Sequence, residues 1–501
     1  MTTITLRKQP PSINMKATTK RLRQVHTTLA FSCGVLLSGS AALADGTQFS
    51  DFWAMPGSAG PTANEAAPIT FGNPLFQQRS IADRLTELNA GEPNTGNWDM
   101  NTVNETAGGR QHGGKGRFLF AVYETGQGGV QRHDLATGET DTIWVSPAFG
   151  GHIAFDACFW TPWGTLITAE ESWETKAGGS TSPYGRVFEF INPITAPGIT
   201  QPVTASSNDG AIFNHTNVIP RVSHEGIQFD SDGNMYFIDE LNGGCLYKYT
   251  SAARMSKVKS GKADYFAAGQ TFVLRVGNGS LPNATGAYTW VPFTDRNGAA
   301  LSGALTITDV RGVTSVDGRN TTDLAAFKGT DYQRPEDLQI QRVGNREYLY
   351  VATTTTNEVY RLDLKGHTIS VFANRNTVDL ATAGLPVGEG LTSPDNLAID
   401  HEGNIYIVED RNGGVDDDIW FANDLNQDGD LNDANEGLAR WASNGTPGSE
   451  FSGLYFDPEN KRRAWVNIQH PASGNDRTIE ITIPRGDDNH GEEEENEGKE
   501  D

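Results

Sequence analysis

Short apolar stretches alternate with turn residues along most of this chain. In the stretch 226–239, apolar and aromatic residues flank the run Asp230-Ser231-Asp232-Gly233-Asn234, and the stretch 396–410 repeats this arrangement around Asp400-His401-Glu402-Gly403-Asn404. Gly and Asn tolerate the positive φ angles of a tight hairpin. The pattern therefore predicts antiparallel strand pairs joined by Asp-x-x-Gly-Asn turns.

Looser copies of the same unit occur elsewhere in the chain, at 118–135, 159–190, 338–362 and 454–483. Long segments, which we interpret as loops, separate some of them, notably 192–222 and 269–333. About six units of short strands are most simply protected from edge pairing by a radial arrangement around a channel. We therefore predict an all-β fold, a six-bladed β-propeller, with a pair of β-sandwiches as the alternative.

The beginning of the chain has the features of an export signal. Lys16, Lys20, Arg21 and Arg23 precede an apolar stretch at 29–37, and a small-x-small cleavage site ends at Ala44. No later apolar stretch is long enough to span a bilayer. The expected organisation is a signal peptide over 1–44, an N-terminal extension over 45–115, the propeller over 116–485 and an acidic disordered tail over 486–501. The mature protein would be periplasmic or secreted, and a monomer is expected.

Composition and charge limit the classes of partner that this protein can bind. The 501 residues include 56 Gly, which suits many tight turns, and the formal net charge is −24. This excess of acid argues against nucleic acid or an anionic membrane as a partner. Exported acidic proteins commonly bind Ca²⁺, which would offset the charge. Cys158 and Cys245 follow the signal, so one disulfide is possible but would not define the fold.

Acidic residues gather at the ends of the predicted strands. The groups are Glu170-Glu171, Ser223-His224-Glu225-Gly226, Asp239-Glu240, Arg334-Pro335-Glu336-Asp337, Ser393-Pro394-Asp395-Asn396 and Gly448-Ser449-Glu450. Blade edges on one face of a propeller converge on its axis, so these residues would meet there. Carboxylates at close range repel and raise one another's pKa unless cations neutralise them. Oxygen-rich groups select hard cations such as Ca²⁺ and also suit Fe³⁺.

Several of these runs together resemble the PhoX alkaline phosphatase family. The resemblance rests on CFWTPWGTLITAEE at 158–171, SHEG at 223–226, RPED at 334–337, SPDN at 393–396 and NIQHP at 467–471, in this order. It implies an exported six-bladed propeller that carries Ca²⁺ and an oxo-bridged iron pair. It further implies the hydrolysis of phosphate monoesters, so the substrate would be a small phosphorylated molecule and the enzyme a phosphoric monoester hydrolase.

The resemblance also implies roles for individual residues. Cys158 would be a thiolate ligand of Fe³⁺, and Glu225 and Glu336 would be its carboxylate ligands. Arg334 would bind the substrate phosphate. The residues implied for Ca²⁺ are Asp395 and Asn396, with Glu170 or Glu171, Asp239 or Glu240, and Glu450 as further candidates.

The sequence departs from the family in places. The residues 118–124 do not supply the usual early Asn-Asn-Asp or Asn-Cys-Asp element, Ala169 stands where a Cys is usual, and Ser172 where an Asn is usual. Purely structural roles for the same residues also stay open. Cys158 could be a small buried apolar residue, the 334–337 run could be a salt-bridged strand entry, and His224 and His470 would brace carboxylates rather than bind metal.

A second calcium signal lies at 424–432. Asp424, Asn426, Asp428 and Asp430 place oxygens at alternate positions around Gly429, as in the first part of an EF-hand loop. Position twelve is Asn435, with Glu436 one place late. We interpret the run as a structural Ca²⁺-binding loop, with a solvated polar turn as the alternative.

Two other functions fit the same sequence. A calcium-stabilised binding propeller could keep the scaffold without turnover, and a gluconolactonase-type propeller also uses Glu, Asn and Asp around a Ca²⁺ ion. Cys158 and Arg334 favour the phosphoesterase, because lactone opening needs neither.

Overall fold

The computed structural model describes residues 48–106, 114–147, 151–173, 179–203, 213–382, 384–411 and 417–484. All of them belong to one compact unit, Ala44–Asp501. The expected signal peptide and acidic tail lie outside the described residues. Strands form almost all of the regular structure, so the predicted all-β class is confirmed. No helix in the described part of the chain is long and apolar enough to span a membrane.

Antiparallel sheets of four or five strands account for most of this unit. Two of them come from consecutive strands: β3 (Trp98–Val103), β4 (Phe118–Tyr123), β5 (Gly129–Asp134) and β6 (Glu139–Val145), then β7 (Phe155–Trp160), β8 (Leu166–Glu170), β9 (Val187–Phe190) and β10 (Phe213–His215).

A nine-stranded sheet follows and consists of two such groups. The first contains β11 (Ile227–Phe229), β12 (Asn234–Ile238), β14 (Leu246–Ser251), β15 (Gly269–Val276) and β16 (Gly286–Pro292). The second contains β20 (Pro335–Val343), β21 (Arg346–Thr353), β22 (Glu358–Asp363) and β23 (Thr368–Asn374). Only the pairs Gly286–Ile369 and Ala287–Thr368 join β16 to β23. The segment 269–333, which the sequence suggested was a loop, therefore begins with two strands of this sheet.

The N-terminal strands complete the last two sheets. β1 (Ile69–Phe71) pairs with β27 (Gly437–Asn444) at the edge of one sheet, which continues with β26 (Asp418–Asn423), β25 (Ile405–Glu409) and β24 (Pro394–Ile399). β2 (Gln77–Asp83) pairs with β30 (Arg477–Thr482) at the edge of the other sheet, which continues with β29 (Arg463–Gln469) and β28 (Glu450–Phe456). Strands of the sheets thus begin well before residue 116, the expected start of the propeller, because residues near the N-terminus pair with strands near the C-terminus.

The remaining elements are short. They are the strand pairs β13 (Asn242–Gly244) with β19 (Tyr332–Gln333) and β17 (Thr306–Thr308) with β18 (Thr314–Val316), and the helices α1 (Arg84–Ala90), α2 (Met255–Lys259), α3 (Gly318–Thr321) and η1 (Gly388–Gly390).

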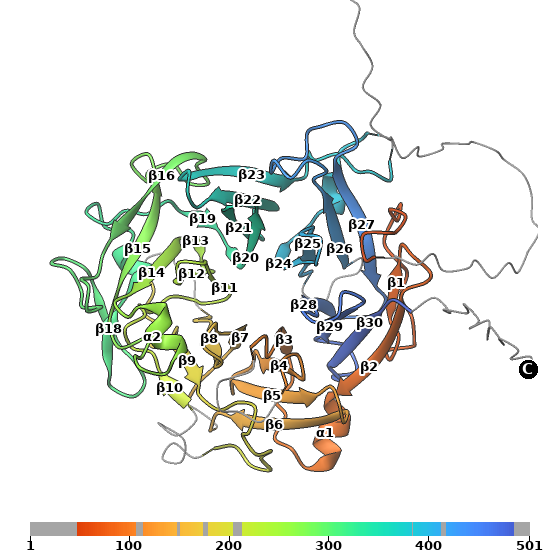
Figure 1. The fold of residues 1–501 in the computed structure, drawn as a ribbon, viewed down its shortest axis with the longest axis horizontal. Coiled ribbons are helices and arrows are strands. Elements are labelled where there is room, and N and C mark those ends of the chain that lie inside the picture. The colour runs from red at the N-terminus through yellow and green to blue at the C-terminus, as the bar shows by residue number, and fades with distance from the viewer. Residues whose placement is uncertain are drawn as a thin grey trace, which may run out of the picture. The chain divides into compact units, whose positions relative to one another are not determined.

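The inner strands of the sheets form a closed ring. Each contacts the next in the order β3, β7, β11, β20, β24, β28 and back to β3. The sheets of this unit radiate from that ring, which is the arrangement of a propeller (Figure 1). Apolar clusters fill the space between neighbouring sheets; Phe120 of β4, for example, stacks on Trp160 of β7 at 5.7 Å between ring centroids. The packing holds the beginnings of the inner strands around one axis.

The Asp-x-x-Gly-Asn turns are confirmed. Gly233 and Gly403 have φ angles of 83° and 86°. Asp230 accepts a hydrogen bond from the backbone N of Asn234 at 2.8 Å, and Asp400 accepts the equivalent bond from Asn404 at 2.9 Å. Each turn joins an inner strand to its neighbour, β11 to β12 and β24 to β25.

Candidate metal centre

Every inner strand contributes a carboxylate at or just before its beginning. These residues are Asp99 (β3), Asp156 (β7), Glu225 (ahead of β11), Glu336 (β20), Asp395 (β24) and Glu450 (β28). In four of the strand pairs the register shifts at this point, between 98 and 101, 155 and 158, 335 and 338, and 394 and 397. Such β-bulges redirect side chains out of the regular alternation. The local structure therefore presents one acid per inner strand near the axis.

A second set of acids follows the neighbouring strands. Glu124, Glu171, Glu240 and Asp410 each lie directly after, or two residues after, the end of β4, β8, β12 or β25. We call both sets together the axial acid group: Asp99, Glu124, Asp156, Glu171, Glu225, Glu240, Glu336, Asp395, Asp410 and Glu450. Their charges act on one another, and burial together with these neighbours raises the pKa of Asp99, Asp156, Glu171, Glu225 and Asp395 well above the usual range.

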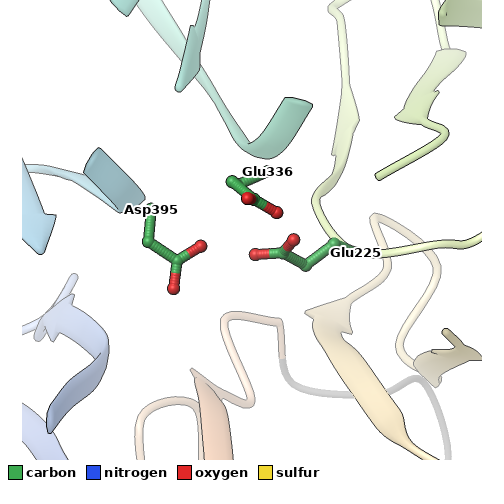
Figure 2. A group of neighbouring side chains, drawn as sticks. All are labelled: Glu225, Glu336 and Asp395. Atoms are coloured by element: carbon green, nitrogen blue, oxygen red, sulfur yellow. The ribbon is translucent and has the colours of Figure 1, made fainter. Parts of the chain in front are cut away.

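Three members of the group lie closest together. One carboxylate oxygen from each of Glu225, Glu336 and Asp395 lies within 4.8 Å of the others, and the three side chains point toward a common space (Figure 2). Glu336 accepts a hydrogen bond from the Thr354 hydroxyl through Oε1, while its Oε2 is buried without a hydrogen-bond partner among the described residues. Burial raises the pKa of Glu336 to about 7. All three residues are candidate metal ligands on the sequence alone.

Arg334 stands beside this triad. Its Nε donates to Glu240 Oε1 at 2.9 Å and lies 3.1 Å from Glu336 Oε1, and 35% of the side chain is exposed. Its φ of 58° is in the left-handed region, as is that of Ser393 (49°), which occupies the same place ahead of β24. This entry turn directs Arg334 to the acids, whose charges hold the pKa of its guanidinium above the usual value.

The adjacent acids at the ends of β8 and β12 lie in different environments. Both side-chain oxygens of Glu170 bind the guanidinium of Arg186, at 2.5 and 2.8 Å, and both partners are buried. Glu171 instead belongs to the axial acid group and accepts from the Trp173 indole at 2.8 Å. Asp239 accepts from the backbone N of Ser223 at 3.1 Å, and Glu240 faces Arg334.

The two remaining axial candidates also differ. Asn396 Oδ1 accepts from the backbone N of Gly453 at 2.6 Å, which links β24 to β28. Glu450 lies 3.2 Å from His470 Nε2, its Oε2 is buried without a partner among the described residues, and burial raises its pKa to about 12.

Cys158 does not join the axial acids. It packs in the apolar cluster that contains Phe120 and Trp160, and its Sγ lies 3.7 Å from the backbone oxygen of Phe120. Burial, and then the charge of Asp99, raises the pKa of the thiol. The cavity of about 570 Å³ that Cys158 lines is bounded by no residue of the axial acid group, as far as the described residues go. Cys158 thus lies among apolar residues, and its role as a metal ligand stays a prediction.

The 424–432 loop folds around its own oxygens, on the connection between β26 and β27. Asp424 Oδ2 accepts from the backbone N of Gly429 at 2.9 Å, and Asn426 Nδ2 donates to Asp428 Oδ2 at 3.0 Å. The backbone N of Asp430 donates to Asp428 at 3.1 Å. Glu436, one place beyond the usual closing position, turns back and accepts from the backbone N of Leu425 at 3.0 Å.

Four members of the axial acid group were not predicted from the sequence: Asp99, Glu124, Asp156 and Asp410. A signal for the first and third was present, because each occupies the second position of a strand, as Glu336 and Asp395 do. Glu124 directly follows the last residue of β4, as Glu171 directly follows the last residue of β8. An alignment of the repeated units could therefore have identified Glu124 as well.

Comparisons with known proteins agree with this fold. The family model described as alkaline phosphatase PhoX matches residues 157–472. A structure of Pseudomonas fluorescens PhoX in complex with vanadate, a transition state analogue, is similar with a TM-score of 0.59 and 16% identity, covering 86% of this chain and 98% of that chain. A gluconolactonase from Xanthomonas campestris matches at a TM-score of 0.38 and 13% identity, over 86% and 98% of the two chains. A search of curated proteins found no match.

Proposed function

The chain belongs to the PhoX family of alkaline phosphatases, and we propose that it hydrolyses phosphate monoesters at metal ions held by the axial acid group. The observation that carries this proposal is the position of Arg334 beside the triad Glu225, Glu336 and Asp395. An anionic substrate cannot approach so many carboxylates unless cations reverse their field. The arginine and the metal ions would together meet the phosphate.

The residues present fit hard cations. Asp156 Oδ1, Glu336 Oε2 and Glu450 Oε2 are buried oxygens without hydrogen-bond partners in the described part of the chain. Such oxygens are costly unless something pairs with them. Carboxylate oxygens are the donors that Ca²⁺ prefers, and Fe³⁺ accepts them as well. When bound, such ions supply positive charge that polarises the phosphoryl oxygens.

Within this centre the chain's own residues have distinct tasks. Glu225, Glu336 and Asp395 would hold metal, and Glu171, Glu240 and Glu450 are further ligand candidates. Arg334 is held by Glu240 and Glu336, so its planar guanidinium is oriented before substrate arrives. Two parallel N–H donors match two phosphate oxygens and the charge that grows on them during transfer. The vanadate complex of the Pseudomonas protein supports phosphoryl transfer on this fold.

Other parts of the proposal extend the description of the fold. We also propose that the propeller has six blades, one for each inner strand; this number follows if the nine-stranded sheet is divided between β16 and β23. The 424–432 loop would bind a separate structural Ca²⁺ ion. We further propose that the protein is exported through the signal at 1–44 and acts as a monomer.

Arg334 provides the test. We expect Arg334→Ala to keep its metal content and to lose about two to three orders of magnitude in phosphomonoesterase rate, because a preorganised charge donor is removed. Arg334→Lys should recover little, since it keeps the charge without the two-pronged geometry. The matched control is Arg346→Ala, an exposed arginine that pairs with Asp363 at 2.8 Å away from the acids.

Initial rates and elemental analysis on the three purified variants separate the possibilities. Loss of metal together with activity in Arg334→Ala would make Arg334 a structural residue of the centre. A fully metallated wild-type protein that hydrolyses no phosphate monoester would refute the proposed function.

A further inference from the structure

The acid that β7 presents to the axis is Asp156. Its side chain is 4% exposed, and its Oδ1 has no hydrogen-bond partner among the described residues. The charges that act on it most strongly are those of Asp99 and Glu124, both of them carboxylates. By contrast Asp99 accepts from Ser452 Oγ at 2.5 Å, and buried Glu170 binds Arg186. Asp156 is therefore a buried carboxylate that has other carboxylates as its nearest charged neighbours. One of its oxygens has no hydrogen-bond partner among the described residues.

Cys158, two residues further along the same strand, has the opposite surroundings. The register of β7 and β8 shifts between Phe155 and Cys158, so the alternation of the strand is broken between Asp156 and Cys158. Cys158 then packs against aromatic residues of the sheet β3 to β6, with its Sγ 3.7 Å from a backbone oxygen. A Cys ligand must present its sulfur to the metal, and the sulfur of Cys158 instead faces a backbone carbonyl oxygen inside an apolar cluster.

We propose that Asp156, and not Cys158, is the metal ligand contributed by β7, so that the metal centre of this protein has no thiolate ligand. This inference rests on the proposed metal centre. It replaces the sulfur implied by the family resemblance with a carboxylate at the position equivalent to Glu336 in β20 and Asp395 in β24. Asp156 would then join Glu225, Glu336 and Asp395 as an oxygen ligand at the beginning of an inner strand.

The chemical consequence is a change in the metals that the centre selects. Thiolate is a soft ligand, and a carboxylate in its place shifts preference toward hard, oxygen-binding cations. The protein should therefore bind Ca²⁺ and Fe³⁺ through oxygen alone. Its iron form should lack the thiolate-to-iron charge-transfer absorption in the visible range that a Cys ligand produces.

The test compares wild type with Asp156→Asn, Cys158→Ala and Asp156→Cys. Each mature protein is stripped with a chelator, reloaded with Ca²⁺ and Fe³⁺, and measured by elemental analysis and visible absorption. Loss of an outer partner of a ligand already costs 10–100-fold in metal affinity, so Asp156→Asn should bind metal at least about 100-fold more weakly. Cys158→Ala should keep the metal content and spectrum of wild type. Asp156→Cys should gain a charge-transfer band.

The stability of the chelated proteins gives a second measurement. Asp156→Asn removes a buried carboxyl group that lies among other carboxyl groups, so the chelated variant should melt no lower than chelated wild type. A lower melting temperature would assign Asp156 a packing role and overturn the proposal. So would a charge-transfer band in wild type that disappears in Cys158→Ala. A wild-type protein that binds no metal refutes the metal centre itself, and that failure is visible without any variant.

Discussion

Removing the metal ions should make the stability of this protein strongly dependent on pH, with Glu336 as a measurable part of the effect. Burial raises the pKa of Glu336 from 4.5 to about 7. The folded state thus holds this proton more tightly than the unfolded state does. The stabilisation it gives is fully present below the unfolded value of 4.5 and is lost as the pH rises through about 7.

The magnitude follows from the size of the shift. One pKa unit corresponds to about 1.4 kcal/mol, so Glu336 alone should lower the free energy of unfolding by about 2 to 3 kcal/mol between pH 5 and pH 9. Burial also raises the pKa of seven other axial acids, so the whole chelated protein should lose more than this; they are Asp99, Glu124, Asp156, Glu171, Glu225, Asp395 and Glu450. Bound cations replace the protons, and the stabilisation by metal should therefore be larger at pH 9 than at pH 5.

The assay is denaturant unfolding of chelated wild type and chelated Glu336→Gln at both pH values. Glu336→Gln should reduce the difference between pH 5 and pH 9 by about 2 to 3 kcal/mol. Glu389→Gln is the matched control, because Glu389 is an exposed glutamate whose side chain is 87% accessible. If chelated wild type becomes more stable toward pH 9, or if Glu336→Gln keeps the full dependence, the reasoning about this carboxylate is wrong.

Two further variants test residues outside the triad. Glu170→Gln leaves the buried guanidinium of Arg186 without its carboxylate, so it should lower the free energy of unfolding by about 3 to 5 kcal/mol while elemental analysis finds unchanged metal content; loss of a metal ion would instead make Glu170 a ligand. Asp424→Ala should remove the part of the thermal stabilisation by Ca²⁺ that belongs to the 424–432 loop, about 2.7 kcal/mol if Ca²⁺ is present at one hundred times its Kd. Phosphatase rates at saturating Ca²⁺ should not change, and a loss of rate would place this loop in the active centre.

The parts of the fold that the sequence predicted are those that depend on local chemistry. Asp230 and Gly233 form the same turn as Asp400 and Gly403, because an Asp side chain that caps its own turn and a Gly with positive φ need no distant partner. The pairing of the N-terminal edge strands β1 and β2 could not be predicted in this way. Their partners β27 and β30 lie near the other end of the chain, and pairing over such a separation leaves no local pattern.

The candidate site shows the same division. Glu225, Glu336 and Asp395 were named because each stands in a short motif beside a strand. The sequence alone did not distinguish Glu170 from Glu171. In the structure Glu170 forms an ion pair with Arg186, whereas Glu171 lies among the axial acids. Adjacent residues at a strand end point in different directions, and which of them meets an arginine depends on the register with the next strand.

The crowding of acids around the axis connects folding, metal binding and catalysis. Arg334 pairs with the axial acid group through Glu240 and Glu336. One guanidinium cannot neutralise so many carboxylates, so the metal-free protein must keep several of them protonated. Metal ions bound there would displace those protons and reverse the sign of the local field. The affinity for metal should then rise with pH, together with the fraction of centres that can attract a phosphate.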